Sequence, residues 1–303
     1  MTRTTDNSQS ALYRGRFAPS PSGPLHFGSL IAAVGSYLEA RSRDGEWLVR
    51  MEDLDPPREE PGASDDILRT LEQFGFMWDG PVLYQSSRIE AYQDALSQLE
   101  SDRQTYGCAC SRKEINEIAE QGVEGPIYPG TCRGGLSAGR KPRSIRLLTP
   151  IEPHRFTDKL CGEIIQSIST EIGDFVVCRA DGIIAYQLAV VVDDDYQGIT
   201  DVVRGADLLN STPRQIHLQS LLGIDLLNYA HLPLILNESG QKLSKQNGAR
   251  PISRTPVIDA LIASLRFLQQ PLPEEIPDDP ESFWQWAIAN WNIERIPAPI
   301  LRF

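Results

Sequence analysis

Two short segments that lie far apart in the chain combine residue types suited to phosphate chemistry. The first joins an expected strand to an expected helix and contains His26, Gly28 and Ser29. A helix N-terminus presents unpaired N–H groups and the positive end of the helix dipole, and both attract phosphate. The second lies in a loop flanked by glycines and contains Lys242, Leu243, Ser244 and Lys245. Two lysines three residues apart can neutralise the charge that develops during transfer at phosphorus.

Each segment taken alone also has an ordinary interpretation. The first could be a rigid turn with a surface histidine, and the second a solvated charged loop. The combination of a His-x-Gly turn at the first strand-to-helix junction with a much later Lys-x-Ser-Lys loop is more specific. We therefore predict a site for a nucleotide polyphosphate.

A third group of residues could bind a metal ion. Residues 106–143 are rich in glycine and proline and contain Cys108, Cys110 and Cys132. Three thiolates in a segment too poor in apolar residues to form its own core suit a structural zinc ion. A C-x-C pair with one further cysteine is a weaker pattern than two C-x-x-C pairs, so buried unrelated thiols remain an alternative. Cys161 and Cys178 fall in expected sheet elements, where we expect buried, small apolar side chains.

The elements that must position the first segment form a βαβ unit. We predict a strand over 13–17, a proline-rich loop over 18–24, a helix up to Gly45 and a strand over 47–51. This order is typical of a parallel sheet that binds ligands at the carboxyl ends of its strands. The predicted fold class is α/β, with a Rossmann-like parallel-sheet nucleotide-binding domain.

The rest of the chain divides around the cysteine-rich insertion. We predict a helix capped by Ser64, a helix over 87–99, and a short helix with a capping box at Ser111. Beyond the insertion we expect strands over 144–148, 174–179, 201–204 and 232–236, an apolar run ending at Val192, and helices over 212–222 and 255–267. An acidic linker over 271–281 precedes a small aromatic packing unit formed by Phe283, Trp284, Trp286 and Trp291. The expected divisions are 11–105 and 144–250 for the two catalytic halves, 106–143 for the insertion and 251–303 for a helical C-terminal region.

Composition limits the class of protein. The 303 residues are 41% hydrophobic and 23% charged, which is typical of a folded globular chain. The longest apolar stretch is too short to span a membrane, and the N-terminus lacks the apolar core of a signal peptide, so we expect a cytoplasmic protein. The net charge of −12 argues against non-specific coating of nucleic acid. A local basic patch is still predicted within 131–155, from Arg133, Arg140, Lys141, Arg143, Arg146 and Arg155.

Several motifs resemble those of a known family. HFGS at 26–29 and KLSKQ at 242–246 look like variants of the HIGH and KMSKS signatures of class I aminoacyl-tRNA synthetases. RFAPSPSG at 16–23, RMEDLDPPR at 50–58 and VVDDDYQGITDVVRG at 191–205 resemble the glutamyl subgroup. The resemblance spans roughly Arg14 to Gly248, and it departs from the signatures at Phe27, Ser29, Leu243 and Gln246.

The resemblance implies roles for individual residues. His26 and Lys245 would be catalytic, and ATP would be bound by His26, Gly28, Ser29, Lys242, Leu243, Ser244 and Lys245. Glutamate would be bound by Arg16, Phe17, Ala18, Pro19, Ser20, Glu52, Tyr186 and Arg204. Two arginines suit a dicarboxylic amino acid, because Arg pairs with carboxylates bidentately. Glu52 would meet the α-amino group, and Tyr186 would close the side-chain pocket.

These assignments have structural alternatives. Arg204 could cap a strand, Glu52 could form a loop ion pair, and Tyr186 could be core. Mg²⁺ would arrive with ATP, so the acidic run at 193–195 is interpreted as structural. The fourth ligand of one structural Zn²⁺, beside Cys108, Cys110 and Cys132, would be Tyr128.

Length narrows the expected reaction. Only 58 residues follow Lys245, too few for an anticodon-binding domain. The chain therefore resembles truncated paralogues that activate L-glutamate with ATP, without tRNA, and attach it to queuosine at the wobble position of tRNA(Asp). Conventional 3′-end charging of tRNA(Glu) or tRNA(Gln), and a catalytically silent nucleotide-binding regulator, remain alternatives. The expected form is a monomer.

Overall fold

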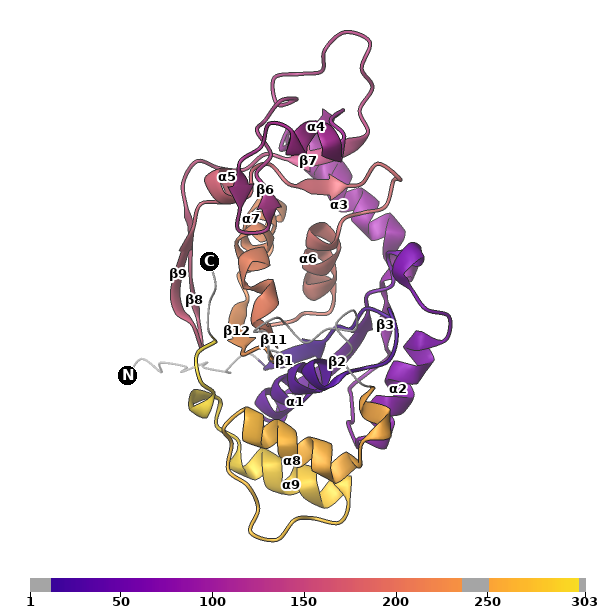
Figure 1. Cartoon of the computed structure of the whole chain (residues 1–303), viewed down its shortest axis with the longest axis vertical. Helices are drawn as coiled ribbons and strands as arrows, with labels where there is room; N and C mark the ends of the chain where they lie inside the picture. The colour runs from indigo at the N-terminus through magenta and orange to yellow at the C-terminus, as the bar shows by residue number, and fades with distance from the viewer. Residues whose placement is uncertain (1–11, 236–250, 300–303) are drawn as a thin grey trace, which may run out of the picture.

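Figure 1 shows the computed structural model of the protein, in which residues 12–235 and 251–299 are described. The predicted phosphate-binding residues Lys242, Leu243, Ser244 and Lys245 lie outside the described residues. Within the described ranges, no helix is long and apolar enough to cross a membrane.

The predicted βαβ unit is confirmed. Strand β1 (Arg14–Phe17) is followed by helix α1 (Phe27–Arg41) and strand β2 (Glu46–Met51). β1 and β2 pair in parallel, with Arg14 opposite Glu46 and Phe17 opposite Val49. Side chains from both strands pack against the inner face of α1, which is buried along most of its length.

The parallel arrangement continues on both sides of this unit (Figure 1). β3 (Leu83–Tyr84) pairs in parallel with β2, and β11 (Asp201–Gly205) pairs in parallel with β12 (Asn228–Leu232). The two groups of strands meet where the Thr200 N–H donates to the Arg14 carbonyl at 2.9 Å. The carboxyl ends of β1, β2, β11 and β12 therefore lie at one edge. The predicted strand over 232–236 was wrong, because β12 ends at Leu232.

An antiparallel extension of the β11–β12 sheet and one separate sheet flank this centre. β8 (His154–Asp158) and β9 (Gly162–Gln166) form an antiparallel hairpin, and β8 joins β12. β4 (Thr105–Cys108), β7 (Ser144–Leu147) and β10 (Val176–Cys178) form an antiparallel sheet. A second core lies between this sheet and the helices α3 (Ile89–Ser101), α6 (Tyr186–Tyr196) and α7 (Thr212–Leu222). The apolar run that ends at Val192 thus enters a helix.

The insertion contains the predicted capping box. Ser111 caps α4 (Arg112–Asn116), and the Glu114 side chain accepts from the Ser111 N–H. Strands β5 (Gln121–Gly122) and β6 (Gly125–Pro126) follow as a small hairpin. The predicted cap at Ser64 was wrong: the N-cap of α2 (Ala63–Gln73) is Gly62, two residues earlier. Gly62 has a φ of 79°, a left-handed conformation that glycine adopts without strain.

The C-terminal aromatic residues do not form a separate unit. α8 (Val257–Phe267) and α9 (Pro280–Asn290) pack against α1 at the lower end of Figure 1. Phe283 and Trp284 are buried in the same core as the first βαβ unit, and the Trp284 indole donates to the Phe74 carbonyl at 2.9 Å. The remaining short helices of the described residues are α5 (Ile168–Glu171) and the 3₁₀ turns Pro56–Arg58, Gln85–Arg88, Ala206–Ser211, Ile252–Arg254 and Ile293–Arg295.

Candidate active site

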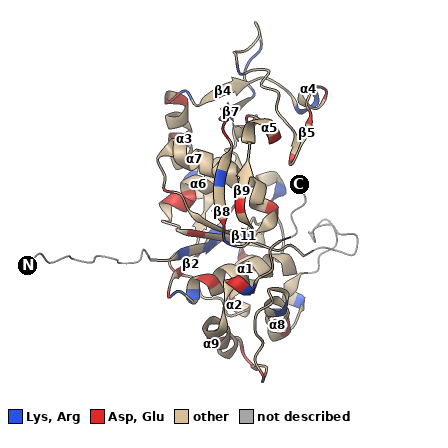
Figure 2. Ribbon diagram, turned by 90° about the vertical axis from the view of Figure 1, so that its left-hand side faces the viewer, with Lys and Arg blue, Asp and Glu red and all other residues tan. Residues whose placement is uncertain are grey.

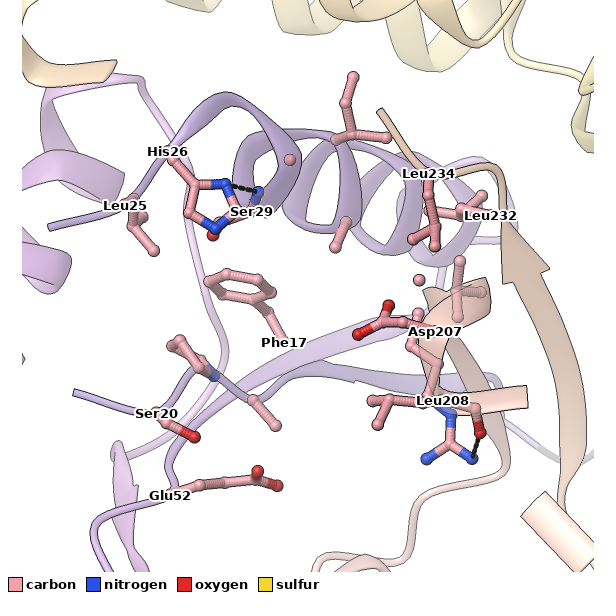
Figure 3. Close-up of a pocket in the computed structure, with 18 of the residues that line it drawn as sticks. Phe17, Ser20, Leu25, His26, Ser29, Glu52, Asp207, Leu208, Leu232 and Leu234 are labelled. Carbon is pink, nitrogen blue, oxygen red and sulfur yellow. Dashed lines mark hydrogen bonds between the residues drawn. The ribbon is translucent and has the colours of Figure 1, made fainter. Parts of the chain in front are cut away.

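A pocket of about 570 Å³ opens at the carboxyl edge of the parallel strands (Figure 3). This is the place where open α/β sheets usually bind ligands, because loops diverge there and leave a crevice. The described residues predicted to bind glutamate and ATP all line this one pocket: Arg16, Phe17, Ala18, Pro19, Ser20, His26, Gly28, Ser29, Glu52, Tyr186 and Arg204. The fold thus brings together side chains from five separate segments.

His26 forms the start of α1. Its Nδ1 accepts a hydrogen bond from the Ser29 backbone N–H at 3.2 Å (Figure 3). Because Nδ1 accepts, the neutral ring carries its proton on Nε2 and can donate from that atom. A Cβ at Gly28 would lie 3.0 Å from the ring, so glycine leaves room for the capping imidazole. The helix N-terminus and the ring donor therefore face the pocket together, as a phosphate site requires.

Arg16 is anchored from behind by a buried carboxylate. Its Nε lies 3.1 Å from Asp194 Oδ1, and Arg50 Nη1 lies 2.8 Å from the same oxygen. Burial acts to raise the pKa of the Asp194 carboxyl, but Arg16 and Arg50 outweigh burial and lower it. Asp194 is consequently ionised, and it holds Arg16 at the pocket wall. The acidic run at 193–195 thus includes a structural carboxylate.

Arg204 is held by neutral groups instead. Its Nε donates to His231 Nε2 at 3.1 Å, and its Nη2 donates to Thr212 Oγ1 at 2.9 Å. Its remaining nitrogen, Nη1, is buried and has no hydrogen-bond partner within the described part of the chain. An unpaired buried guanidinium N–H is costly unless a ligand satisfies it. Because Arg204 lines the pocket, this N–H is a candidate group for binding an anionic ligand.

Glu52 and Tyr186 complete the polar lining. Glu52 extends into the cavity below Phe17 (Figure 3), and its Oε1 lies 3.5 Å from Arg50 Nη2. Burial raises the pKa of Glu52, although Arg50 and Arg16 oppose this effect. Burial also raises the pKa of the Tyr186 hydroxyl, which therefore stays protonated and able to donate. A cationic group placed beside Glu52 would favour its ionised form.

The charges around this part of the pocket favour an anionic ligand. Among the charged residues that line the pocket, Arg16, Arg58 and Arg204 contribute three positive charges. Glu52 and Asp207 contribute at most two negative charges. Arg16 and Arg204 are almost fully buried, so water screens their positive charge only weakly. A ligand with one net negative charge would balance the site.

The chain segments on either side of 236–250 both reach the pocket region. Ile235 lines the pocket. Pro251 forms a β-bridge with His26, and the Ile252 N–H donates to the Leu25 carbonyl at 3.0 Å. Lys245 is therefore six residues away in sequence from a residue that contacts the first predicted phosphate-binding segment.

The predicted metal ligands converge in the insertion. The Sγ atoms of Cys108, Cys110 and Cys132 all lie within 4.8 Å of one another. Tyr128 Oη lies 3.3 Å from Cys108 Sγ and 3.8 Å from Cys110 Sγ, and Cys110 Sγ lies 3.6 Å from Cys132 Sγ. Tetrahedral zinc with Zn–S bonds of about 2.3 Å sets sulfur atoms about 3.8 Å apart. Three thiols and one phenol oxygen with these spacings fit a zinc ion.

The surroundings of the cluster favour a thiolate. Burial would raise the pKa of Cys108, but hydrogen bonds with Tyr128 and Arg146 lower it to about 7. The Arg146 guanidinium carbon lies 3.7 Å from the centre of the Tyr128 ring. Burial raises the pKa of Tyr128, so its oxygen would become a phenolate only through a bound cation. Among the described residues, this is the only group of three or more His, Cys, Asp or Glu side chains close enough to share an ion.

Several residues of the predicted basic patch have acidic partners, and Figure 2 shows both basic (blue) and acidic (red) segments around α4 and β5. Arg146 is buried and donates to the Asp174 carbonyl at 2.6 Å. Arg133 pairs with Asp174 and Arg140 with Glu114, both from other segments, and Arg155 pairs with Glu163 across the β8–β9 hairpin. Counting charge along one stretch of sequence misses these partners, because they come from other parts of the chain.

Sequence reasoning missed four polar residues around the site. Arg50 and His231 are fully buried. Asp158 contacts His231, and Thr212 accepts a hydrogen bond from Arg204. The one signal for Arg50 was its place in the RMEDLDPPR motif. For His231, a histidine within an apolar strand was the available signal.

The fold and the pocket together define a class of enzyme. The family model "tRNA synthetases class I (E and Q), catalytic domain" matches residues 13–259, and the chain belongs to this family. It is a ligase of the aminoacyl-tRNA synthetase type, as predicted.

Individual proteins of one name match this chain over almost their full length. A "Glutamyl-Q tRNA(Asp) synthetase" from Dechloromonas aromatica (strain RCB) is 58% identical over 288 residues, which cover 94% of this chain and 96% of that protein. A protein with the same name from Chromobacterium violaceum is 55% identical, and the match covers 95% of this chain and 96% of that protein. Another, from Pseudomonas aeruginosa (strain PAO1), is 51% identical, and the match covers 94% of this chain and 95% of that protein. These matches confirm the predicted resemblance to the truncated glutamyl-type group.

Solved structures agree on the fold. A glutamate tRNA ligase from Elizabethkingia meningosepticum, in complex with its amino acid, superposes with a TM-score of 0.80 at 24% identity. A glutamate-tRNA synthetase from Elizabethkingia anophelis superposes with a TM-score of 0.80 at 22% identity. The matches cover 94% and 96% of this chain but 66% and 68% of those chains. They support the class I α/β catalytic fold predicted from the motifs.

Proposed function

We propose that the protein activates L-glutamate with ATP, without tRNA, and transfers it to the queuosine base at the wobble position of tRNA(Asp). The observation that carries the first half of this proposal is the unpaired, buried Nη1 of Arg204 in a pocket with excess positive charge. A dicarboxylic amino acid with one net negative charge matches that excess. The second half draws on the printed name that the relatives share.

Glutamate binding uses the two arginines that the resemblance assigned. Arg204 receives one carboxylate, since its Nη1 has no partner among the residues that the structure describes, and the Tyr186 hydroxyl donates to the same end of the substrate. Glu52 accepts from the α-ammonium group, which keeps that carboxyl ionised. Arg16, held by Asp194, also lines the pocket and balances the second carboxylate. Phe17, Ala18, Pro19 and Ser20 shape the remaining wall.

Activation joins the α-carboxylate oxygen to the α-phosphorus of ATP and releases pyrophosphate. Both reactants are anions, so the step needs fixed positive charge and held orientation. The N-terminus of α1 and the Nε2–H of His26 bind phosphate oxygens. Lys242 and Lys245 stabilise the charge that develops on the departing pyrophosphate, with Lys245 acting mainly in the transition state. Mg²⁺ enters on ATP.

A structural zinc ion belongs to the same proposal. Cys108, Cys110, Cys132 and Tyr128 would hold it, and it would supply only a cross-link between β4 and the loop after β6. The segment needs such a link, because its own buried cluster contains only four side chains. No step of the reaction passes through this metal.

The acceptor in the proposal is the anticodon loop. A hydroxyl of the queuosine ring attacks the carbonyl carbon of the adenylate, and AMP leaves. Single-stranded loops suit this chemistry, because an unstacked base can be extruded into a protein site. The proposal needs no anticodon-binding domain, and residues 251–299 instead complete the core around α1.

The test has two parts. The protein should exchange pyrophosphate into ATP with glutamate and without tRNA, and aspartate should be a poor substitute because its side chain is one methylene shorter. Radiolabelled glutamate should then be transferred to a short tRNA(Asp) stem-loop that carries queuosine, and not to the same stem-loop with guanosine.

Two results would contradict the proposal in different ways. Label found by nuclease mapping at the 3′ end of unmodified tRNA(Glu) or tRNA(Gln) would leave the activation chemistry intact but change the acceptor. Absence of glutamate-dependent exchange would favour a silent nucleotide-binding regulator.

A further inference from the structure

Arg204 lies at the end of a buried chain of side chains that crosses three neighbouring strands. Arg204 on β11 is directly opposite His231 on β12, and β12 is joined in turn to β8, which ends at Asp158 (Figure 1). His231 Nδ1 lies 2.7 Å from Asp158 Oδ2, and Arg204 Nε lies 3.1 Å from His231 Nε2. All three side chains are at least 95% buried.

The contacts determine which nitrogen of His231 carries the proton. The hydrogen bond from His231 and backbone N–H groups lower the pKa of Asp158 despite its burial, so this group is a carboxylate that can only accept. His231 must therefore donate from Nδ1. Arg204 can only donate, so Nε2 must accept. A single neutral tautomer, with the proton on Nδ1, satisfies both neighbours, and burial lowers the pKa of His231 to about 4.

Resting on the proposed function, we propose that His231 and Asp158 are positioning residues that set the Arg204 guanidinium for the substrate carboxylate. His231 accepts the hydrogen bond from Nε of Arg204, and Thr212 accepts the hydrogen bond from Nη2. With these two directions occupied, the guanidinium plane is fixed, and the unpaired Nη1 is the group left for a ligand. Neither positioning residue is among those that line the pocket.

Asp158 controls the orientation of His231 through its second oxygen. Asp158 Oδ1 accepts from the backbone N–H groups of Leu160, Cys161 and His231 at 3.0, 2.9 and 3.3 Å. In Asp158→Asn, these three donors hold the amide oxygen at the Oδ1 position. The amide NH₂ then faces His231 and donates to Nδ1, which moves the ring proton to Nε2. With a proton on Nε2, two N–H donors would face each other, and the hydrogen bond from Arg204 Nε would be lost.

Two substitutions of His231 separate its two contacts. In His231→Asn, the shorter amide stands near the Nδ1 position and can still bond Asp158, but nothing accepts from Arg204. In His231→Gln, the longer amide oxygen stands near the Nε2 position and can accept from Arg204, while the contact with Asp158 is lost. His217 provides the control, because it is a buried histidine that takes no part in the hydrogen bonds between Arg204, His231 and Asp158. Its Nε2 lies 3.0 Å from the Leu148 carbonyl oxygen, and His217→Gln removes a similar side chain.

The experiment measures KM for glutamate and for ATP, and kcat, in tRNA-free pyrophosphate exchange. His231→Asn and Asp158→Asn should raise KM for glutamate about ten- to hundredfold, the range for one hydrogen bond to a charged group. KM for ATP should change less than threefold, His231→Gln should recover most of the glutamate affinity, and His217→Gln should match the wild type. Equal losses in the Asn and Gln variants, or equal shifts in both KM values, would overturn the proposal, because a merely structural role predicts them.

A second measurement needs neither activity nor a folded variant. The chain has four histidines, so long-range ¹H–¹⁵N spectra of the unsubstituted protein can resolve the His231 ring. The proposal requires the proton on Nδ1, and a proton on Nε2 would refute it. If glutamate supports no exchange in the wild type but the Nδ1 tautomer is present, the proposed substrate fails while the orientation of Arg204 by His231 stands.

Discussion

Replacing Asp194 by Asn tests whether a buried carboxylate holds the arginines of the pocket. Asp194 is 5% exposed and binds Arg16 at 3.1 Å and Arg50 at 2.8 Å. Removing one partner of a buried ion pair typically costs about 3 to 5 kcal/mol, because the other charge stays buried without compensation. Since the Asn oxygen still accepts one hydrogen bond, we expect the lower end, about 3 kcal/mol. With a urea m-value of about 3 kcal/mol/M, the unfolding midpoint should fall by about 1 M.

Asp195 provides the matched control, because it lies one residue further along α6 and is exposed. Asp195→Asn removes the same formal charge and should change the free energy of unfolding by less than about 0.5 kcal/mol. Equal unfolding midpoints for Asp194→Asn and Asp195→Asn would refute the reasoning.

The pH dependence has a defined sign. The pKa of Asp194 is lowered in the folded protein, so its stabilisation is fully present above the ordinary Asp value of about 4. That stabilisation is lost as the pH falls through the lower, folded value. The difference between wild type and Asp194→Asn should therefore stay constant from pH 7 to about pH 5 and shrink in more acidic solution. A difference that grows on acidification would contradict this assignment.

Two further predictions concern the phosphate loop and the metal. Lys245→Ala should lower kcat for pyrophosphate exchange by at least about tenfold with less effect on KM for glutamate, as expected for a contact made in the transition state; a change confined to KM would argue against that role. Metal analysis of protein purified without chelators should find about one zinc per chain, and Cys110→Ala should lose it while Cys178→Ala, outside the cluster, keeps it. Loss of zinc should impair transfer to RNA more than glutamate activation, and zinc-free wild-type protein would eliminate the metal site.

Much of the local structure could be predicted from the sequence. The βαβ unit, the capping box at Ser111 and the helix over 212–222 depend on spacing, caps and turns within a few residues of one another. The same is true of the His26 segment, whose chemistry follows from its place at a helix start. The cysteine spacing likewise indicated the insertion cluster, and the fold gathers those thiols.

Only the tertiary structure decided which charges meet. The 131–155 stretch is basic as a sequence, yet Arg133 and Arg155 pair with acids outside it. Phe283 and Trp284 are local in sequence but belong to the core of the first βαβ unit, because α9 packs on α1.

The same holds for the site itself. The sequence determined that Arg16 and Arg204 are candidates for carboxylate binding, through the motifs that contain them. The ion pair between Asp194 and Arg16 depends on α6 meeting β1. The contact of Arg204 with His231, and of His231 with Asp158, depends on β12 lying between β11 and β8. Burial makes such pairings decisive, since a charge removed from water responds to whichever group the whole fold places beside it.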